Sequence, residues 1–408
     1  MPPLPYAPGF YDPRRLAYAA ELAQGTGRFQ EPPRADCPWC GSGRLRTRLR
    51  APDLLQHKPG TFAVDECLDC GHAFQNPRLT AAGLAFYHRD FDEDAPEGLA
   101  APVLAARRAR RRHRSDARLM STVGEPESWL DVGTGHGHFP GAAREVFPYT
   151  AFDGLDPTQR VERAREQGWV EEAHVGHLAD PHVAERLRGR YDVVSVFHHL
   201  AHVPDPRAEL RGALTALRPG GHLLIELPDP HCVPARLLGR WWLPHGQPRH
   251  LHLLPLDNLR AELESQGCTI LATDRRTPHR PNDLSAAVAL LLTHVLPAAD
   301  APWRDNPPTG LPHTLRTALT TLAGPLVGAV ALLDLLLSPL LRRAPGLSNT
   351  YRVVARRPVL TGPQPGPPPG PPPDPGQPRS TSAWPATTSR TCSHSAANAA
   401  FRRPSSSR

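Results

Sequence analysis

Two pairs of cysteines near the N-terminus have the spacing of a metal site. Each pair is a C-x2-C turn followed by glycine, in CPWCG and in CLDCG. Such a turn directs two thiolates at one ion, and four thiolates satisfy a tetrahedral zinc without leaving a position open for catalysis. We therefore predict one structural zinc, with redox chemistry at a single pair as the alternative. The predicted ligands are Cys37, Cys40, Cys67 and Cys70.

A glycine-rich turn in WLDVGTGHGHF, residues 129–139, can accommodate a nucleoside-like ligand. An apolar strand enters the turn, and its glycines allow the backbone to bend sharply and to approach a ligand closely. Their GxGxG spacing differs from the GxGxxG of dinucleotide-binding folds. A second predicted strand ends at Asp156, whose carboxylate can accept both hydroxyls of a ribose. The sequence thus predicts a nucleoside site at the ends of two strands.

Three histidines follow a third predicted strand, which ends at Phe197. They are His198, His199 and His202 in the segment HHLAHVPDP. In open α/β sheets ligands bind beyond the carboxyl ends of the strands, which is where these side chains begin. Because a neutral imidazole titrates near neutral pH, one of them can serve as a general base. The alternative is that they bond loop backbone or orient a cofactor.

The elements that must position these residues follow an alternating pattern. Apolar strand-like runs alternate with helical stretches from residue 128 to about residue 276, which indicates a parallel sheet with crossover helices. An insertion at 277–347 with two apolar helical runs precedes a last strand. Other helices are expected over 13–24 and 100–122. The predicted strands are residues 128–133, 150–156, 191–197, 222–228, 268–274 and 349–357.

Over residues 128–276 the chain resembles class I S-adenosylmethionine-dependent methyltransferases. The resemblance rests on four blocks in order: LDVGTGHG, the acid in GLDPT, the run from YDVV to HVPDP, and LRPGGHLLIELP. It implies a doubly wound, mostly parallel, seven-stranded Rossmann-like sheet that binds S-adenosylmethionine. Where the family usually has LEH, this chain has LAH, so Ala201 replaces an acid. The cofactor residues that the resemblance implies are Asp131, Gly133, Thr134, Gly135, Gly137, Asp156, Asp180 and Phe197, with His177 as an alternative to Asp180.

The segment after the second cysteine pair, GHAFQNPRLTAAGLAFYHRDF, extends the resemblance to a bacterial zinc-ribbon group of these enzymes. This implies a ribbon that supports the fold or shapes the substrate site. His250 and His252 become candidates for the substrate side, with core or capping roles as the alternative. The expected organisation is an N-terminal extension (1–35), a zinc ribbon (36–80), a helical linker (81–127), a methyltransferase domain (128–357) and a disordered tail (358–408).

Composition limits the partners of the chain. The net charge of the 408 residues is +7, and the proline-rich tail carries much of it, so we expect no nucleic-acid partner. No apolar leader follows the first methionine, and we expect a cytoplasmic protein with reduced thiols. The basic run at 106–114 is expected to be a solvated helix, with binding of a phosphate-bearing substrate or an anionic lipid as the alternative.

The apolar run at 322–341 raises the question of a membrane. It holds a single charged residue, Asp334, and the other apolar run, 285–297, is too short to span a bilayer. We therefore expect the two runs to pack on protein, with peripheral membrane contact and a lipid-like acceptor as alternatives. The prediction is methyl transfer to a small-molecule or lipid-like acceptor. The alternatives are an NAD-dependent oxidoreductase and a non-catalytic protein that binds S-adenosylmethionine.

Overall fold

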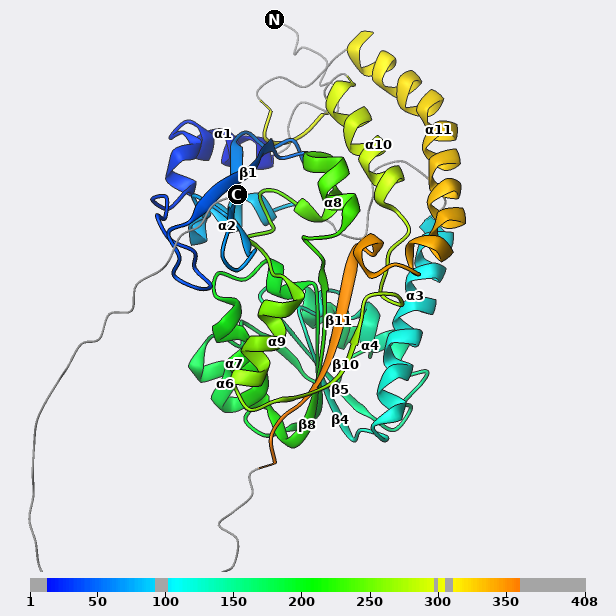
Figure 1. The fold of residues 1–408 in the computed structure, drawn as a ribbon. Helices are drawn as coiled ribbons and strands as arrows, with labels where there is room; N and C mark the ends of the chain where they lie inside the picture. The colour runs from blue at the N-terminus through cyan, green and yellow to red at the C-terminus, as the bar shows by residue number, and fades with distance from the viewer. Residues whose placement is uncertain (1–12, 92–101, 297–299, 305–310, 360–408) are drawn as a thin grey trace, which may run out of the picture. The chain divides into compact units, whose positions relative to one another are not determined.

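The computed structural model describes residues 13–91, 102–296, 300–304 and 311–359 (Figure 1). The expected disordered tail, except its first two residues, and the first twelve residues of the N-terminal extension lie outside these ranges. The alternation in the sequence forms a seven-stranded sheet in the order β10-β11-β8-β7-β4-β5-β6. Its strands are β4 (Ser128–Val132), β5 (Ala151–Asp156), β6 (Ala173–Val175), β7 (Tyr191–Phe197), β8 (Leu217–Pro228), β10 (Thr269–Asp274) and β11 (Thr350–Arg356).

The direction of the strands follows from their connections. The pairs of β4 with β5, β5 with β6, β4 with β7 and β7 with β8 are parallel, as helical crossovers require. Strand β11 returns after the insertion and runs antiparallel to both β8 and β10. All six predicted strands are present. The seventh strand, β6, was not predicted individually, because its three residues are too few to show a periodic pattern. The doubly wound, mostly parallel fold is confirmed.

Helices cover both faces of this sheet (Figure 1). Successive residues of β4 point to opposite faces: Trp129 packs with Phe139 and Phe147 on one side, and Leu130 joins the larger core on the other. Burial on both faces explains why these strands are continuous apolar runs. The helices are α3 (Pro102–Leu119), α4 (His138–Ala143), α5 (Arg160–Glu166), α6 (Pro181–Arg186), α7 (Pro206–Ala216) and α9 (Leu256–Ser265).

A second, four-stranded antiparallel sheet carries the cysteine pairs. Its order is β1-β2-β3-β9, so its last strand comes from the C-terminal half of the chain. The pairing of Phe74 with His252 therefore joins the cysteine module to the segment that follows the large sheet. The elements of this module are α1 (Pro13–Leu22), β1 (Leu45–Pro52), β2 (Thr61–Cys67), β3 (Ala73–Gln75), α2 (Ala81–His88) and β9 (His252–Leu253).

The insertion forms the two predicted helices, α10 (Asp283–Val295) and α11 (Leu311–Leu341), after a short helix α8 (Val233–Leu238). Helix α11 packs mainly on α10. The expectation that the apolar run packs on protein is met on a narrow face only, because 11% of the most apolar 18-residue window of α11 is buried. Short 3-10 helices occupy Thr26–Phe29, Met120–Thr122, His199–Ala201, Gly239–Trp241, Leu243–His245 and Pro345–Leu347.

Candidate functional site

The glycine turn joins β4 to α4, and its three glycines have different roles. All three have left-handed backbone, with φ of 73° at Gly133, 53° at Gly135 and 79° at Gly137. A Cβ at Gly133 would lie 2.7 Å from the side chain of His199, and one at Gly137 would lie 2.6 Å from Ala164. A Cβ at Gly135 would meet nothing within 4 Å. Packing therefore requires the outer glycines, whereas the central glycine borders open space.

Asp156, at the carboxyl end of β5, holds this turn. One of its carboxylate oxygens accepts from the backbone N–H of Gly135 at 3.0 Å. The other accepts from the backbone N–H and the hydroxyl of Thr158, at 2.8 and 2.6 Å. A carboxylate has about four lone-pair sites, so acceptor capacity remains. The sheet thus brings an acid to the open space beside Gly135.

Of the other predicted cofactor residues, Asp131, Thr134 and Phe197 lie at or near the ends of β4 and β7, whereas Asp180 lies at the start of α6. Asp131 is buried and accepts from the Ser195 hydroxyl at 2.6 Å, and burial raises the pKa of Asp131 to about 7. The hydroxyl of Thr134 is buried without a partner among the described residues. Phe197 packs on Phe139, 4.6 Å between ring centroids. Asp180, by contrast, caps α6 by accepting from the N–H of His182 at 2.9 Å, which is a local structural role.

The three candidate histidines contact three different partners in the structure. His199 contacts Glu209, 3.2 Å from Nε2 to the carboxylate, and the same carboxylate accepts the backbone N–H groups of residues 178 and 179. His202 donates from Nδ1 to the carbonyl of Arg249 at 3.2 Å. His198 has left-handed backbone, φ 59°, and its Nε2 lies 3.1 Å from Glu226. The first two are engaged with loops, and His198 joins a charged cluster.

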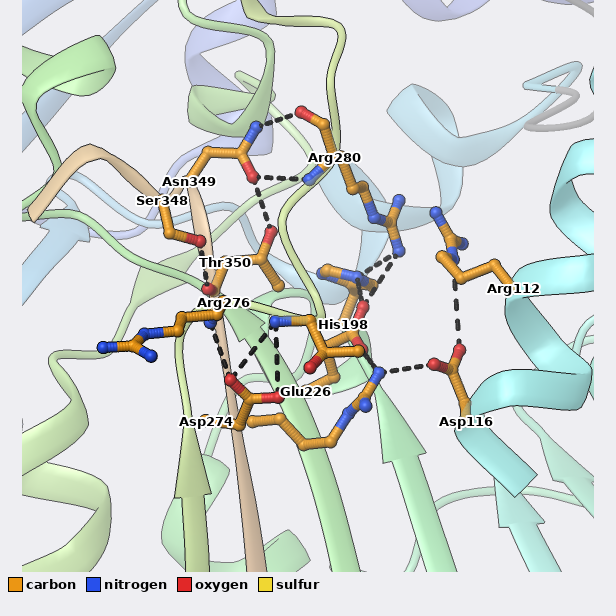
Figure 2. Close-up of polar contacts among 12 residues, drawn as sticks. Arg112, Asp116, His198, Glu226, Asp274, Arg276, Arg280, Ser348, Asn349 and Thr350 are labelled. Carbon is orange, nitrogen blue, oxygen red and sulfur yellow. Dashed lines mark hydrogen bonds and ion pairs between the residues drawn. The ribbon is translucent and has the colours of Figure 1, made fainter. Parts of the chain in front are cut away.

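That cluster, which we call the Glu226 cluster, includes Arg112, Asp116, His198, Glu226 and Arg280, which Figure 2 labels. Its sixth member is Arg352, which bonds both Asp116 and Glu226. Glu226 lies two residues before the end of β8 and is 1% exposed. It accepts from Arg352 at 2.5 Å and faces Arg280 at 3.5 Å, and Arg352 also bonds Asp116 at 2.6 Å. Burial alone would raise the pKa of Glu226, but His198 and the two arginines outweigh it and hold the pKa below its ordinary value.

Positive charge exceeds negative charge in the Glu226 cluster, with three guanidinium groups against two carboxylates. Burial and then Arg280 lower the pKa of His198 to about 4, so this imidazole is neutral at pH 7. Buried N–H groups of Arg112, Arg280 and Arg352 have no hydrogen-bond partner in the described part of the chain. Asn349 fixes the backbone of Arg280 through bonds of 3.0 and 2.7 Å (Figure 2). This edge of the sheet can therefore receive an anionic or proton-releasing group.

Sequence reasoning did not identify this cluster. The acid at 226 was visible as a charge within an apolar strand, LLIELP. Its partners come from helix α3, from the insertion and from the last strand, and Asp116 and Arg352 are 236 residues apart. No spacing rule links residues so distant, so only the assembled sheet reveals them.

The four predicted metal ligands converge. The Sγ atoms of Cys37 and Cys70 are 3.7 Å apart, those of Cys40 and Cys67 are 3.5 Å apart, and all four lie within 4.8 Å of one another. A Zn–S bond of about 2.3 Å gives tetrahedral S···S edges of about 3.8 Å, so the cluster fits zinc. Four thiolates complete the coordination, which suits a structural ion.

The two candidate substrate histidines lie where the cysteine module meets the segment 247–259. His252 stacks on His72, and its ring nitrogens contact His72 at 3.2 Å and the carbonyl of Pro204 at 3.3 Å. His250 donates to the carbonyl of Pro244 at 2.6 Å. Both rings are thus engaged in packing, which favours their structural alternative.

Comparisons with known proteins agree with this geometry. Residues 104–273 match a family model described as a methyltransferase domain. Two curated relatives are ubiquinone biosynthesis O-methyltransferases, from Cronobacter sakazakii (35% identity over 99 residues, 24% of this chain and 40% of the relative) and Escherichia coli O7:K1 (34% over 99 residues, 24% and 41%). The chain spans about two fifths of the length of these relatives.

Solved structures are also similar. An O-methyltransferase family protein from Burkholderia thailandensis shares 22% identity over 40% of this chain and 52% of that one, with a TM-score of 0.35. The N-methyltransferase NodS from Bradyrhizobium japonicum, in complex with S-adenosyl-L-homocysteine, shares 20% identity over 40% and 76%, with a TM-score of 0.31.

Proposed function

We propose that this chain, in which residues 104–273 form a class I S-adenosylmethionine-dependent methyltransferase domain, transfers a methyl group to a small-molecule acceptor. The observation that carries the proposal is the open space over Gly135 beside Asp156. It lies at the carboxyl ends of β4 and β5, next to β7, where the order of the strands reverses along the chain. Ligands of open α/β sheets bind at such switch points.

The residues of this edge fit S-adenosylmethionine. Asp156 retains acceptor capacity for the ribose hydroxyls, and the turn at residues 133–137 leaves space for backbone to approach the ligand. Bound S-adenosylmethionine supplies a methyl group that its sulfonium centre has already activated. The contribution of the chain is then mainly to position the acceptor and to exclude water.

We assign proton acceptance to His198. Its imidazole is neutral at pH 7, because burial and then Arg280 lower its pKa to about 4. Its Nε2 is engaged by Glu226 and by the guanidinium of Arg280, so Nδ1 is the nitrogen that takes the proton of an acceptor hydroxyl, and Glu226 offsets the charge of the resulting imidazolium. His199 and His202 instead hold the loops beneath the site through Glu209 and the carbonyl of Arg249. The named relatives are O-methyltransferases, and we extend a hydroxyl acceptor to this chain as part of the proposal.

We further propose that the cysteine cluster binds one structural zinc and supports the site from the N-terminal side. His72, two residues after Cys70, stacks on His252, which in turn contacts the loop carrying His202 through the carbonyl of Pro204. Zinc chemistry is not needed for the transfer, since four thiolates leave no coordination position for a substrate.

The test is a binding titration followed by a labelling experiment. We expect the purified protein to bind S-adenosylmethionine and S-adenosylhomocysteine but not NAD. With S-adenosylmethionine labelled in the methyl group and extract of the source organism, we expect one labelled small-molecule product, which His198→Ala reduces strongly without loss of cofactor binding. Binding of NAD alone would favour an oxidoreductase. Cofactor binding without any labelled product in the extract would favour a non-catalytic binding protein.

A further inference from the structure

Helix α11 differs from a surface helix of a soluble domain, because its buried residues are polar and most of its leucines are exposed. A surface helix normally turns its apolar stripe to the core and its polar side chains to water. In the described part of α11 the two buried residues are polar: Asp334 is 1% exposed and Ser338 is 7% exposed. Val327, Val330 and Leu335 are half-buried beside them. Most leucines of α11 face outward, with 44–74% of each exposed. They are Leu315, Leu322, Leu326, Leu332, Leu333, Leu336 and Leu340.

The single acid of the apolar run is satisfied inside the protein. The carboxylate of Asp334 accepts the backbone N–H of Leu284 at 3.1 Å and that of Ser285 at 2.8 Å, and also the Ser285 hydroxyl at 2.6 Å. These groups are at the first turn of α10, where Asn282 makes no side-chain cap. Asp334 therefore caps α10 from the neighbouring helix, and the charge does not reach the outer face.

Two further hydroxyls of the helix are satisfied by its own backbone. The hydroxyls of Thr320 and Thr321 donate to the carbonyls of residues 316 and 317 of their own helix. From Thr317 to Leu341 the helix is about 38 Å long at 1.5 Å per residue. Along this length the exposed residues are leucine, alanine, proline, one glycine and two threonines, and none of them is charged.

Basic residues stand at both ends of this face. Arg316 lies in the first turns of α11, and the exposed Arg342 and Arg343 follow its last residue directly. The acids of α10 and α11, Asp283 and Asp334, are both buried. An apolar stripe between basic ends complements a bilayer whose surface carries anionic headgroups.

We propose that the α10–α11 hairpin docks this protein on an anionic lipid bilayer, with α11 lying in the plane of the interface. The pairing of Asp334 with α10 keeps the polar face of α11 on the protein while its leucines enter the lipid. A second copy of the chain fits less well, because a parallel or an antiparallel pair of α11 helices would bring the basic ends together. A single crossing by α11, which is long and apolar enough to span a bilayer, would place β10 and β11 on opposite sides although they are neighbours in one sheet. A second crossing by α10 does not fit, since its 13 residues extend about 20 Å against a hydrocarbon core of about 30 Å.

The test uses the full chain and flotation with lipid vesicles, so it does not depend on methyl transfer. We expect flotation with vesicles of phosphatidylcholine mixed with phosphatidylglycerol, weaker flotation with phosphatidylcholine alone, and partial release by salt. The double variant Leu322→Gln, Leu336→Gln should lower the vesicle partition coefficient about tenfold. The matched control places glutamine at Val175 and Leu271, exposed positions on the edge strands β6 and β10, and should bind as the wild type does.

Four outcomes would overturn the proposal. The first is a failure of the wild-type chain to float with either vesicle. The second is equal flotation of the wild type and the Leu322→Gln, Leu336→Gln variant. The third is a wild-type dimer in size-exclusion chromatography that this variant dissociates, without vesicle binding, which would make the leucine face an interface between copies. Retention of the protein in membranes through alkaline carbonate would instead indicate a span. Circular dichroism of each variant checks that the helices remain folded.

Discussion

Asp156 offers the sharpest test of the proposed cofactor site, because its carboxylate serves both the fold and the ligand. In the structure it accepts from Gly135 and from two donors of Thr158. Asp156→Ala removes these three bonds and the acceptor that we assign to the ribose. Asp156→Asn keeps one acceptor oxygen, and Thr158→Val removes the hydroxyl bond while leaving the carboxylate in place.

The expected magnitude follows from the two ribose hydroxyls. A hydrogen bond to a charged group contributes about 1.5–3 kcal/mol, so loss of two costs about 3–6 kcal/mol of binding free energy. Each tenfold change in a dissociation constant corresponds to about 1.4 kcal/mol, so the dissociation constant for S-adenosylmethionine should rise roughly 10²- to 10⁴-fold in Asp156→Ala. Asp156→Asn should lose about half of that free energy. Thr158 is exposed, so in Asp156→Ala water can replace the two bonds that the carboxylate accepts from Thr158. The free energy of unfolding of Asp156→Ala should therefore fall by about 1–2 kcal/mol only.

Isothermal titration calorimetry with S-adenosylmethionine and S-adenosylhomocysteine measures the binding, and thermal unfolding measures the stability. Thr158→Val is the control, and its affinity should stay within a few-fold of wild type. If folded Asp156→Ala binds S-adenosylmethionine as tightly as wild type does, the carboxylate does not hold the ribose and the site assignment is wrong.

Other predictions address the glycine turn, the metal and the response to pH. Gly135→Val should prevent S-adenosylmethionine binding while the chain stays folded. Gly137→Ala should mainly lower the melting temperature, since its Cβ would lie 2.6 Å from the side chain of Ala164. Calorimetry and thermal unfolding distinguish the two variants, and identical effects of both substitutions would contradict the reasoning. Elemental analysis should find one zinc per chain and almost none after Cys67→Ser with Cys70→Ser; an unchanged metal content would disprove the site. Burial and then Arg249 lower the pKa of His88 to about 3. Since the unfolded chain takes up this proton near pH 6.5, the stability that neutral His88 provides is present above pH 6.5 and lost as the pH falls toward 3, and His88→Phe should flatten that loss in urea unfolding curves measured across this range.

Local patterns were sufficient to predict much of the fold and part of the site. The apolar runs predicted at 128–133, 150–156 and 191–197 form β4, β5 and β7, because a strand buried on both faces must be continuously apolar. The cysteines converged because each C-x2-C turn brings its own pair of sulfurs together. Strands β6 and β9, with three and two residues, were too short to leave a period in the sequence.

What the sequence by itself determined is the set of elements, their order and the identity of residues whose neighbours are near in the chain. The tertiary structure alone decided the rest. It gave three different partners to His198, His199 and His202, which lie within five residues of sequence. It assembled the Glu226 cluster and turned Asp334 toward α10. The physical reason is that buried charges must find partners wherever the fold places them: Asp334 bonds residues 49 and 50 positions away, and Asp116 pairs with Arg352 236 positions away.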